Sequence, residues 1–492
     1  MKKLFNCINS FIFKFSSIFV KVLLIMIIIG MICLDSVYLY EDAPAIRPNF
    51  IYKYLAIIMC AIMLYLIVLV ERKINGKITT KNRKKYLYTV FFIYFVMEII
   101  FIILLPLKPF SDMEEVVKIA MSDFRENIEY IQIYPNNLPT SLLFNILFRF
   151  TIHNYATIKI LNIFCNIITI YYTYKIFDNI YKQKNGIVLL LGLCEIPAFL
   201  YANYVYNDVI FTTFTTIILY IITKKQERKI DFWILNILLF LQYVIRPVGI
   251  VFVIAVEMYY VFKEKNIKKF IVVLLVFLIL NFMHIGVKKI FIPESDEVKE
   301  YPIWSFIQMG INEWKIGFQN ASHSQYWTFA HVKRRIKRMG VKGLTSVLSR
   351  KIFWQWTEGT YQAELYGFGV YDDGFEYETF LTEKVKGNEN SMLRYIIEYI
   401  IKGQYFIISV LSFIGVIIKN EDEETNKKID LLYLFIMGIF SFYVIWEMKS
   451  RYIYCLYPIF IILASKGIKN IYECKEYKKL TAKTNDIKFK KV

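Results

Sequence analysis

Residues 104–115 read LLPLKPFSDMEE, an apolar run that ends at two prolines and gives way at once to acidic residues. Proline breaks the interior of a helix, so a membrane helix that begins near Tyr88 is expected to end here. A carboxylate at the end of such a helix costs free energy, and ionisable residues there mark candidate functional sites. Asp112 is therefore the first candidate, and the rest of the chain is interpreted around it.

The composition is that of a polytopic membrane protein. Of the 492 residues, 57% are hydrophobic, whereas soluble proteins have roughly 45–50%. Apolar runs of about 20 residues, enough to cross a bilayer as a helix, recur along the chain. The net charge of +19 does not indicate nucleic-acid binding, because most basic residues lie in short segments between apolar runs. The scattered cysteines and histidines show neither a CxxC nor an HxxxH pair, so disulfides and a zinc site are not expected.

The basic residues predict the orientation of the spans. Lys and Arg gather in cytoplasmic loops, and the segment from Arg72 to Lys85 is the clearest such loop. The span at about residues 88–107 then ends outside, which places Asp112 on the non-cytoplasmic face. Residues 138–150 are too short to cross a bilayer, and an outer interfacial helix here keeps the later basic clusters inside. We expect about twelve spans, with both chain ends in the cytoplasm.

The predicted fold is all-α, a polytopic membrane protein with external juxtamembrane helices and a small external subdomain. Two spans and a basic loop come first, followed by a membrane core with the acidic loop and the interfacial helix. A polar external subdomain, the C-terminal spans and a basic cytoplasmic tail complete the chain. The bounds of these five parts are 1–86, 87–289, 290–392, 393–468 and 469–492. The basic run Lys333–Arg338 in the subdomain is interpreted as a membrane-surface patch for anionic lipids.

Several polar residues are predicted to meet at the outer ends of the spans. Cations neutralise a phosphate and stabilise the charge that grows on it as it leaves. A carboxylate within hydrogen-bond reach of a hydroxyl can accept its proton as a general base. Asp112 and Asp208 are the predicted catalytic residues, with Asp112 as the base. The predicted substrate-binding residues are Glu114, Tyr134, Asn136, Asn137, Asn207, Arg246, Glu447, Lys449 and Arg451.

Each assignment has a simpler alternative. Asp112 could be a solvated helix cap, or Glu114 or Glu115 could be the true base instead. Asp208 could cap the helix that follows, since Asn-Asp before an apolar run is a capping pattern. Arg246 could extend to lipid headgroups, and residues 447–451 could anchor the chain in the interface.

The order of these motifs resembles that of the GT-C superfamily of integral-membrane glycosyltransferases. It is most similar to the family 39 type, which includes protein O-mannosyltransferases and the aminoarabinose transferases of lipid A. The acidic loop at Asp112 is followed by Tyr134 to Asn137 (YPNN), Tyr204 to Asp208 (YVYND), Ile245 to Gly249 (IRPVG) and Trp446 to Tyr452 (WEMKSRY). The resemblance covers roughly residues 85–465 and lies in the order and shared sidedness of the motifs.

The resemblance implies a polyprenyl-phosphate sugar donor, an active site on the outer face of a bacterial cytoplasmic membrane, and inversion at the sugar carbon. It implies that Asp112 is the catalytic acid of the first external loop and Asp208 the second external acid. The acceptor would be a cell-envelope glycan, a lipid or a protein. Mg²⁺ or Mn²⁺ could assist, although no spacing of carboxylates requires a metal. The two spans before residue 85 are extra relative to the simplest family layout, and the segment from Ile303 does not identify an acceptor.

Two other functions fit the sequence less well. An O-antigen polymerase or ligase also acts on lipid-linked sugars outside, but the early acidic loop favours the first interpretation. A flippase or transporter for lipid-linked sugars would place ionisable residues at mid-span and show repeated halves. Here the polar residues crowd the predicted outer ends of the spans, and no repeat is evident.

Overall fold

The computed structural model describes eleven ranges of the chain. They are residues 2–37, 45–46, 49–75, 82–182, 186–224, 228–292, 300–318, 326–370, 374–386, 391–418 and 422–472. Residues 76–81 of the predicted basic loop and residues 473–492 of the predicted tail lie outside this part of the chain.

The described chain is predominantly helical. Its first half contains α1 (Lys2–Cys33), α2 (Phe50–Asn75), α3 (Arg83–Leu104), α4 (Asp112–Met121), α5 (Ile128–Ile133), α6 (Leu138–Phe150), α7 (Ala156–Tyr181), α8 (Gly186–Leu193), α9 (Ile196–Tyr201) and α10 (Asp208–Thr223). Its second half contains α11 (Lys229–Ile245), α12 (Ile250–Phe262), α13 (Ile267–Phe291), α14 (Ile303–Gly310), α15 (Phe329–Thr357), α16 (Ala363–Phe368), α17 (Phe380–Val385), α18 (Met392–Ile417) and α19 (Glu423–Ile445). The 3₁₀ helices are η1 (Pro135–Asn137), η2 (Pro247–Gly249) and η4 (Ser450–Leu456), and the antiparallel strands β1 (Ser36–Val37) and β2 (Ala45–Ile46) pair with each other.

Eight helices of the described chain are long and apolar enough to cross a membrane. They are α1, α2, α3, α7, α13, α18, α19 and the C-terminal helix Ser450–Tyr472, which begins as η4. The prediction of an all-α multi-pass membrane protein is confirmed at this level. The other four expected spans fall on shorter helices, namely the broken pair α8 and α9, and α10, α11 and α12 with 16, 17 and 13 residues. A straight span needs about 20 residues, so the number twelve stays a prediction.

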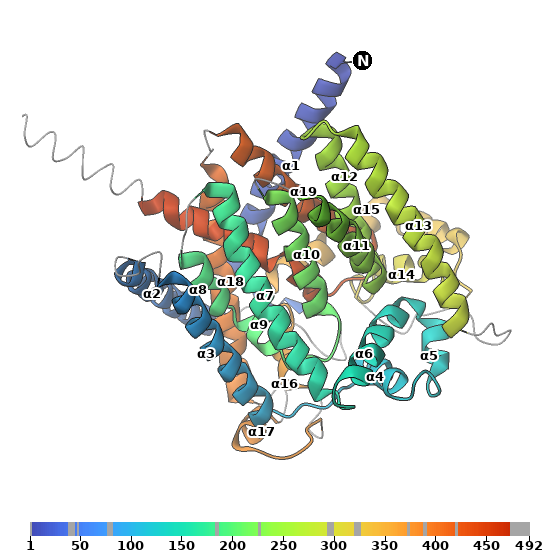
Figure 1. Ribbon diagram of the computed structural model, residues 1–492, viewed down its shortest axis with the longest axis horizontal. Coiled ribbons are helices and arrows are strands. Elements are labelled where there is room, and N and C mark those ends of the chain that lie inside the picture. Colours follow the sequence, from blue (N-terminus) through green and yellow to red (C-terminus); the bar gives the residue numbers. More distant parts are fainter. Residues whose placement is uncertain are drawn as a thin grey trace, which may run out of the picture.

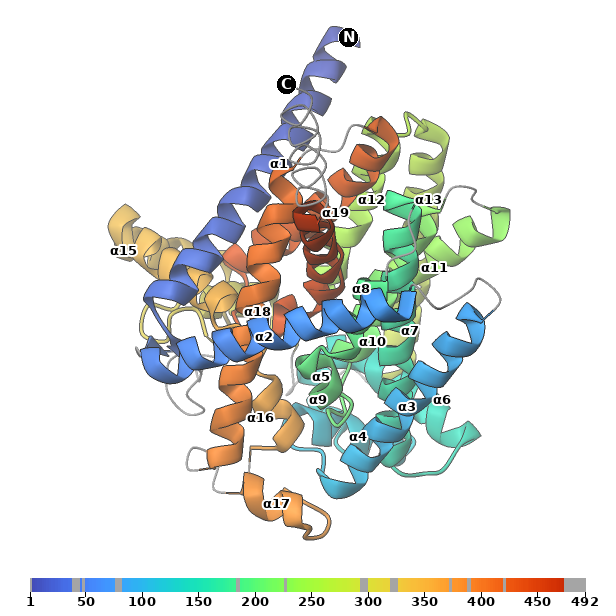
Figure 2. The same ribbon diagram turned by 90° about the vertical axis from the view of Figure 1, so that its left-hand side faces the viewer.

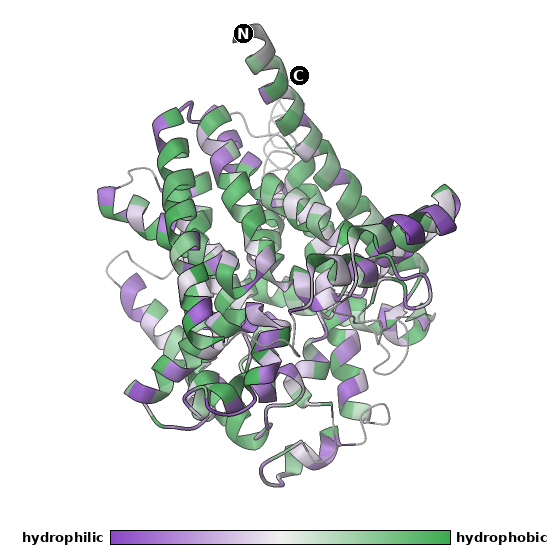
Figure 3. Cartoon of the chain, turned by 90° about the vertical axis from the view of Figure 1, so that its right-hand side faces the viewer, coloured by the Kyte–Doolittle hydropathy of each residue, from purple (hydrophilic) through white to green (hydrophobic). Residues whose placement is uncertain are grey.

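The long helices separate two ends of the molecule. In Figures 1 and 2 the N-terminus and the turn between α12 and α13 lie at one end, and α4, α6 and α17 lie at the other. Hydrophobic residues predominate along the long helices, whereas hydrophilic residues concentrate at helix ends and in connecting segments (Figure 3). This distribution is the one expected when lipid surrounds the middle of the bundle.

The acidic segment folds into a short helix packed on a second one. Asp112 is the first residue of α4, where a negative charge is favoured by the helix dipole. The helix α6 covers the residues predicted for the interfacial helix, and it buries Phe144 and Phe148 while Phe150 is exposed. Extensive contact between α4 and α6 fixes the position of Asp112 at this end of the molecule.

The predicted external subdomain shares its core with the membrane helices. The helix α15 packs on α1 and α19, and α16 packs on α9 and α18. Trp356, Tyr361 and Tyr366 belong to the same buried hydrophobic cluster as the membrane helices. The described part of residues 290–392 is therefore packed into the membrane bundle and does not form a separate domain.

The helix α18 and the C-terminal helix cross at two glycines. A Cβ atom at Gly467 would collide with the Leu411 carbonyl, and one at Gly415 with the Leu463 carbonyl. We predict that Gly467→Ala lowers the free energy of unfolding by about 1–3 kcal/mol, as overpacking usually does. The control is Gly286→Ala, because a Cβ there meets no atom within 4 Å. Thermal unfolding in detergent measures both, and equal midpoints would contradict the prediction.

Candidate functional site

A cavity of about 380 Å³ lies between α5, η1, the junction of α11 and η2, α14 and the segment from Trp446 to Tyr452. Nine of the eleven predicted site residues line it. They are Asp112, Tyr134, Asn136, Asn137, Asn207, Arg246, Glu447, Lys449 and Arg451. The chain therefore brings together residues that are separated by up to about 340 positions in the sequence.

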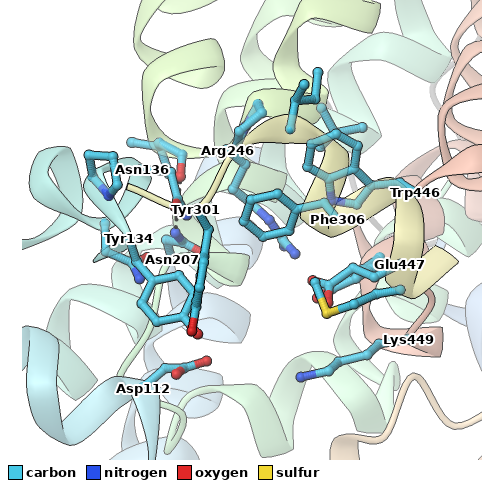
Figure 4. A pocket seen from close by; sticks show the side chains of 18 of the residues that line it. Asp112, Tyr134, Asn136, Asn207, Arg246, Tyr301, Phe306, Trp446, Glu447 and Lys449 are labelled. Carbon is cyan, nitrogen blue, oxygen red and sulfur yellow. Dashed lines mark hydrogen bonds between the residues drawn. The ribbon is translucent and has the colours of Figure 1, made fainter. Parts of the chain in front are cut away.

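Carboxylate and cations approach the cavity from opposite sides. In Figure 4 Asp112 points into the cavity from the first residue of α4, and Lys449 points towards it from the other side. Arg246 enters from the junction of α11 and η2. The aromatic side chains of Phe306 and Trp446 line the wall next to Arg246. The cavity is thus lined by charged groups on opposite sides and by aromatic rings between them.

A chain of hydrogen bonds holds the Asp112 carboxylate. The Tyr206 hydroxyl donates to Asn137 Oδ1 at 2.7 Å, and Asn137 Nδ2 donates to the Tyr130 hydroxyl at 2.8 Å. Tyr130 in turn donates to Asp112. Burial raises the pKa of Tyr130 far above its ordinary value, and the neighbouring Tyr206 and Asp112 raise it further, so this hydroxyl keeps its proton. The hydrogen-bonded chain fixes the orientation of a carboxylate that is itself half-buried.

Asp208 lies behind Arg246 and does not line the cavity. Its carboxylate forms a buried ion pair with the Arg246 guanidinium, and Asp208 is only 1% exposed. Burial alone would lower the pKa of Arg246, but the Asp208 carboxylate, together with smaller effects from neighbouring groups such as Tyr452, raises it on balance. The guanidinium also stands over the ring of Tyr452 at 5.0 Å. Arg246 is therefore a fixed positive charge whose position depends on Asp208.

Lys449 and Arg451 are buried cations without a carboxylate partner in the described part of the chain. Four tyrosine rings surround the Arg451 guanidinium at 4.6–5.7 Å, and one guanidinium nitrogen donates a hydrogen bond to the Tyr204 hydroxyl. Its Nε makes no hydrogen bond within the described ranges. Two desolvated positive charges at a cavity surface favour an anionic ligand, which would compensate them.

Two further predicted features lie outside the cavity. Glu114 is partly exposed and pairs with Lys118 of its own helix at 2.6 Å, so the structure does not bring it to the cavity. The basic run at 333–338 lies on α15, where Arg335 donates to the Gln308 carbonyl and Arg338 pairs with Glu313. None of these residues lines the cavity.

Carboxylates from three parts of the chain line the cavity, namely Asp112, Glu300 and Glu447. The Glu447 carboxylate accepts a hydrogen bond from the Tyr452 hydroxyl at 2.6 Å. Among the residues that the structure describes, no cluster of three or more His, Cys, Asp or Glu side chains is arranged to hold a metal. Mg²⁺ is often held by one or two carboxylates together with substrate phosphates, and Asp112 or Glu447 would be the protein's part of such a site.

Several lining residues carry little or no recognisable signal in the sequence. Tyr130 stands four positions before Tyr134, a spacing that could have indicated it, and the two rings lie 5.2 Å apart. Tyr206 lies within the motif Tyr204 to Asp208. Tyr301 and Phe306 come from a segment without a recognisable motif, and only the folded structure reveals them.

Comparison of the chain with protein-family models, with curated proteins and with solved structures gave no match. The resemblance to GT-C glycosyltransferases stays a prediction.

Proposed function

We propose that the protein is a membrane glycosyltransferase of the GT-C, family 39 type. It would transfer a sugar from a polyprenyl-phosphate carrier to an acceptor hydroxyl on the outer face of the bacterial cytoplasmic membrane. The observation that carries the proposal is that one cavity is lined both by an oriented carboxylate, Asp112, and by the cations Arg246, Lys449 and Arg451. Asp112, Arg246 and Lys449 point into it in Figure 4. The acceptor would be a cell-envelope glycan, a lipid or a protein.

The reaction assigns a role to each side of the cavity. The acceptor oxygen forms a new bond to the anomeric carbon, and its proton passes to the Asp112 carboxylate. The bond between the anomeric carbon and the phosphate oxygen breaks, and the electron pair leaves with polyprenyl phosphate. Lys449 and Arg451 stabilise the negative charge that grows on this phosphate. Attack opposite the leaving group inverts the sugar carbon.

The position of the cavity suits a donor with a long lipid tail. Tyr243 of α11 and Phe442 of α19 line the cavity, and both helices continue into the apolar bundle. Nearby α13 is apolar, and Val273 is its one buried residue, as expected for a lipid-facing helix. A polyprenyl chain could therefore remain in lipid while its phosphate reaches the cations.

The distribution of basic residues supports an external cavity. The turn between α12 and α13 carries Lys263 and Lys265, and it lies at the same end as the N-terminus, opposite α4 (Figures 1 and 2). Basic turns of membrane proteins are cytoplasmic as a rule. The cavity would then open on the other face, as twelve spans with both termini inside also require.

The proposed function can be tested with purified protein in lipid vesicles and a panel of polyprenyl-phosphate sugars, with and without a chelator. We expect one donor to yield glycosylated acceptor and free polyprenyl phosphate in equal amounts. Loss of transfer with chelator would show that the reaction requires a divalent cation, which the cavity carboxylates would bind. Movement of lipid-linked sugar across the vesicle without transfer would contradict the proposal and favour a flippase. Transfer only from pyrophosphate-linked oligosaccharides would favour a polymerase or ligase.

Tyr130→Phe is predicted to lower kcat about 10- to 100-fold. A hydrogen bond to a charged group contributes about 1.5–3 kcal/mol, and Tyr130 makes one to the Asp112 carboxylate. The ring remains, so the fold should be preserved. The control is Tyr88→Phe, because Tyr88 is 74% exposed and does not line the cavity. Steady-state transfer rates measure the effect, and equal rates for both variants would show that the Tyr130 hydroxyl has no role.

A further inference from the structure

A lysine of α15 is buried behind the cavity. Lys351 has no exposed surface, and its ammonium donates to the Gly310 carbonyl at 2.8 Å and to the Trp446 carbonyl at 2.6 Å. It forms no ion pair with any carboxylate in the described ranges. Burial lowers the pKa of Lys351 to about 7, an effect that the Glu447 carboxylate opposes. A buried amine of this kind is costly, and an apolar side chain would fill the same volume without that cost.

The two carbonyls belong to two different walls of the cavity. Gly310 ends α14, which contributes Ile303, Phe306 and Met309 to the lining. Trp446 begins the segment that carries Lys449 and Arg451. Lys351 therefore joins the α14 wall to the cation-bearing wall through one side chain.

Other contacts show that these walls meet closely. A Cβ atom at Gly310 would collide with the backbone of Ile445 and Trp446, so only glycine permits this approach. The rings of Phe306 and Trp446 stack at 5.0 Å with an interplanar angle of 6°. A small change in the spacing of the walls would disturb both contacts and move the lining side chains.

One turn further along α15, a second side chain donates a hydrogen bond to the segment of residues 446–449. Gln355 Nε2 donates to the Lys449 carbonyl at 3.1 Å, and Gln355 is buried. Positions 351 and 355 lie on one face of the helix. Next to the Lys351 side chain, Met448 N donates to the Gly317 carbonyl at 2.9 Å. The backbone of residues 446–449 is thus held at successive points by α15 and by the chain after α14.

We propose that Lys351 and Gln355 are positioning residues that hold residues 446–451 against α14 and thereby set where Lys449 and Arg451 meet the donor phosphate. This proposal rests on the proposed glycosyl transfer. It adds that two residues of α15 hold the donor-phosphate subsite in place. Neither residue lines the cavity, so both act through the segment that they hold.

Transfer kinetics test the positioning role. Lys351→Met and Gln355→Met should lower kcat/KM for the donor on the order of 10- to 100-fold, as misplacement of a binding group does. The KM for the acceptor should stay unchanged. The matched control is Lys342→Met, an exposed lysine of the same helix, which should transfer like the wild type. Gln355→Met removes no charge and therefore tests the proposal even if Lys351→Met folds poorly.

A double-mutant cycle separates positioning from a general loss of stability. If Lys351 acts through Lys449, then adding Lys351→Met to Lys449→Met should cost little more than Lys449→Met alone. Fully multiplicative losses would instead overturn the assignment to this segment.

A distance measurement tests the support without any substrate. Spin labels at Ile303 and Ile445, which are 54% and 51% exposed, report on the two walls. The distance distribution should broaden in Lys351→Met and Gln355→Met but not in Lys342→Met. An unchanged distance distribution would show that Lys351 and Gln355 do not hold residues 446–451 against α14. A broadened distribution with donor kcat/KM within twofold of the wild type would show that this contact has no role in donor binding. Absence of transfer by the wild type would contradict the proposed function alone, since the distances still decide whether the support exists.

Discussion

Asp112→Asn is expected to lower kcat about 10²- to 10⁴-fold, the range that a general base contributes. Asparagine keeps the size of the side chain but cannot accept the acceptor's proton. The Tyr130 hydroxyl can still donate to the amide oxygen, so the local structure should persist. Membrane insertion and the thermal midpoint should match the wild type. Single-turnover transfer with a saturating donor measures the chemical step directly.

Two neighbouring carboxylates provide the controls for this experiment. Glu114→Gln should transfer like the wild type, because Glu114 pairs with Lys118 outside the cavity. Glu447→Gln should have an intermediate effect, because Glu447 lines the cavity but accepts a hydrogen bond from Tyr452. Full activity of Asp112→Asn together with an inactive Glu447→Gln would move the role of base to the opposite wall.

Asp208→Asn is expected to produce the largest loss of stability among the single substitutions considered. It leaves the Arg246 guanidinium buried without its counter-charge, and breaking one side of a buried ion pair costs about 3–5 kcal/mol. Transfer should also fall, because Arg246 lines the cavity and would lose its fixed position. Unfolding in detergent, followed by circular dichroism, measures the stability.

The same ion pair offers an internal control. The double variant Asp208→Asn with Arg246→Met should be more stable than Asp208→Asn alone, since no charge then remains unpaired. Asp123→Asn disrupts an exposed pair with Arg149 and should leave stability unchanged. Equal stability of Asp208→Asn and Asp123→Asn would mean that Asp208 does not hold Arg246.

Much of the site could be predicted because its residues follow changes in the apolar pattern. Asp112 comes directly after a span that ends at Pro106, and Arg246 precedes Pro247 between two apolar runs. Residues 446–452 form a polar interruption between apolar helices. Such interruptions are visible in one dimension, and membrane topology then places them at one face.

The remaining site residues depend on contacts between distant segments. Tyr301 and Phe306 reach the cavity from a polar segment whose placement no local pattern indicates. Lys351 looks like another basic residue of an amphipathic helix, and only the fold shows that its ammonium is buried. Asp208 is predicted to orient the acceptor or a cationic partner, and only the fold shows that its carboxylate pairs with Arg246 and does not line the cavity. Pairing of this kind is a three-dimensional property.

The number of spans was the least predictable feature of the fold. A hydropathy pattern detects apolar runs but not the breaks within them. The run at 187–201 is divided at Glu195, with Pro197 at the start of α9. Arg246 and Pro247 similarly separate α11 from α12. Short helices of this kind need neighbouring helices to cover their ends.

Sided labelling of the cavity end tests the account most directly. Glu114→Cys, in a background without the seven native cysteines, places one thiol beside the cavity. Lys182→Cys places one at the end of α7 that the basic pattern assigns to the cytoplasm. In intact cells a membrane-impermeant maleimide should label position 114, and position 182 only after permeabilisation. Labelling of position 182 but not position 114 in intact cells would contradict an external active site.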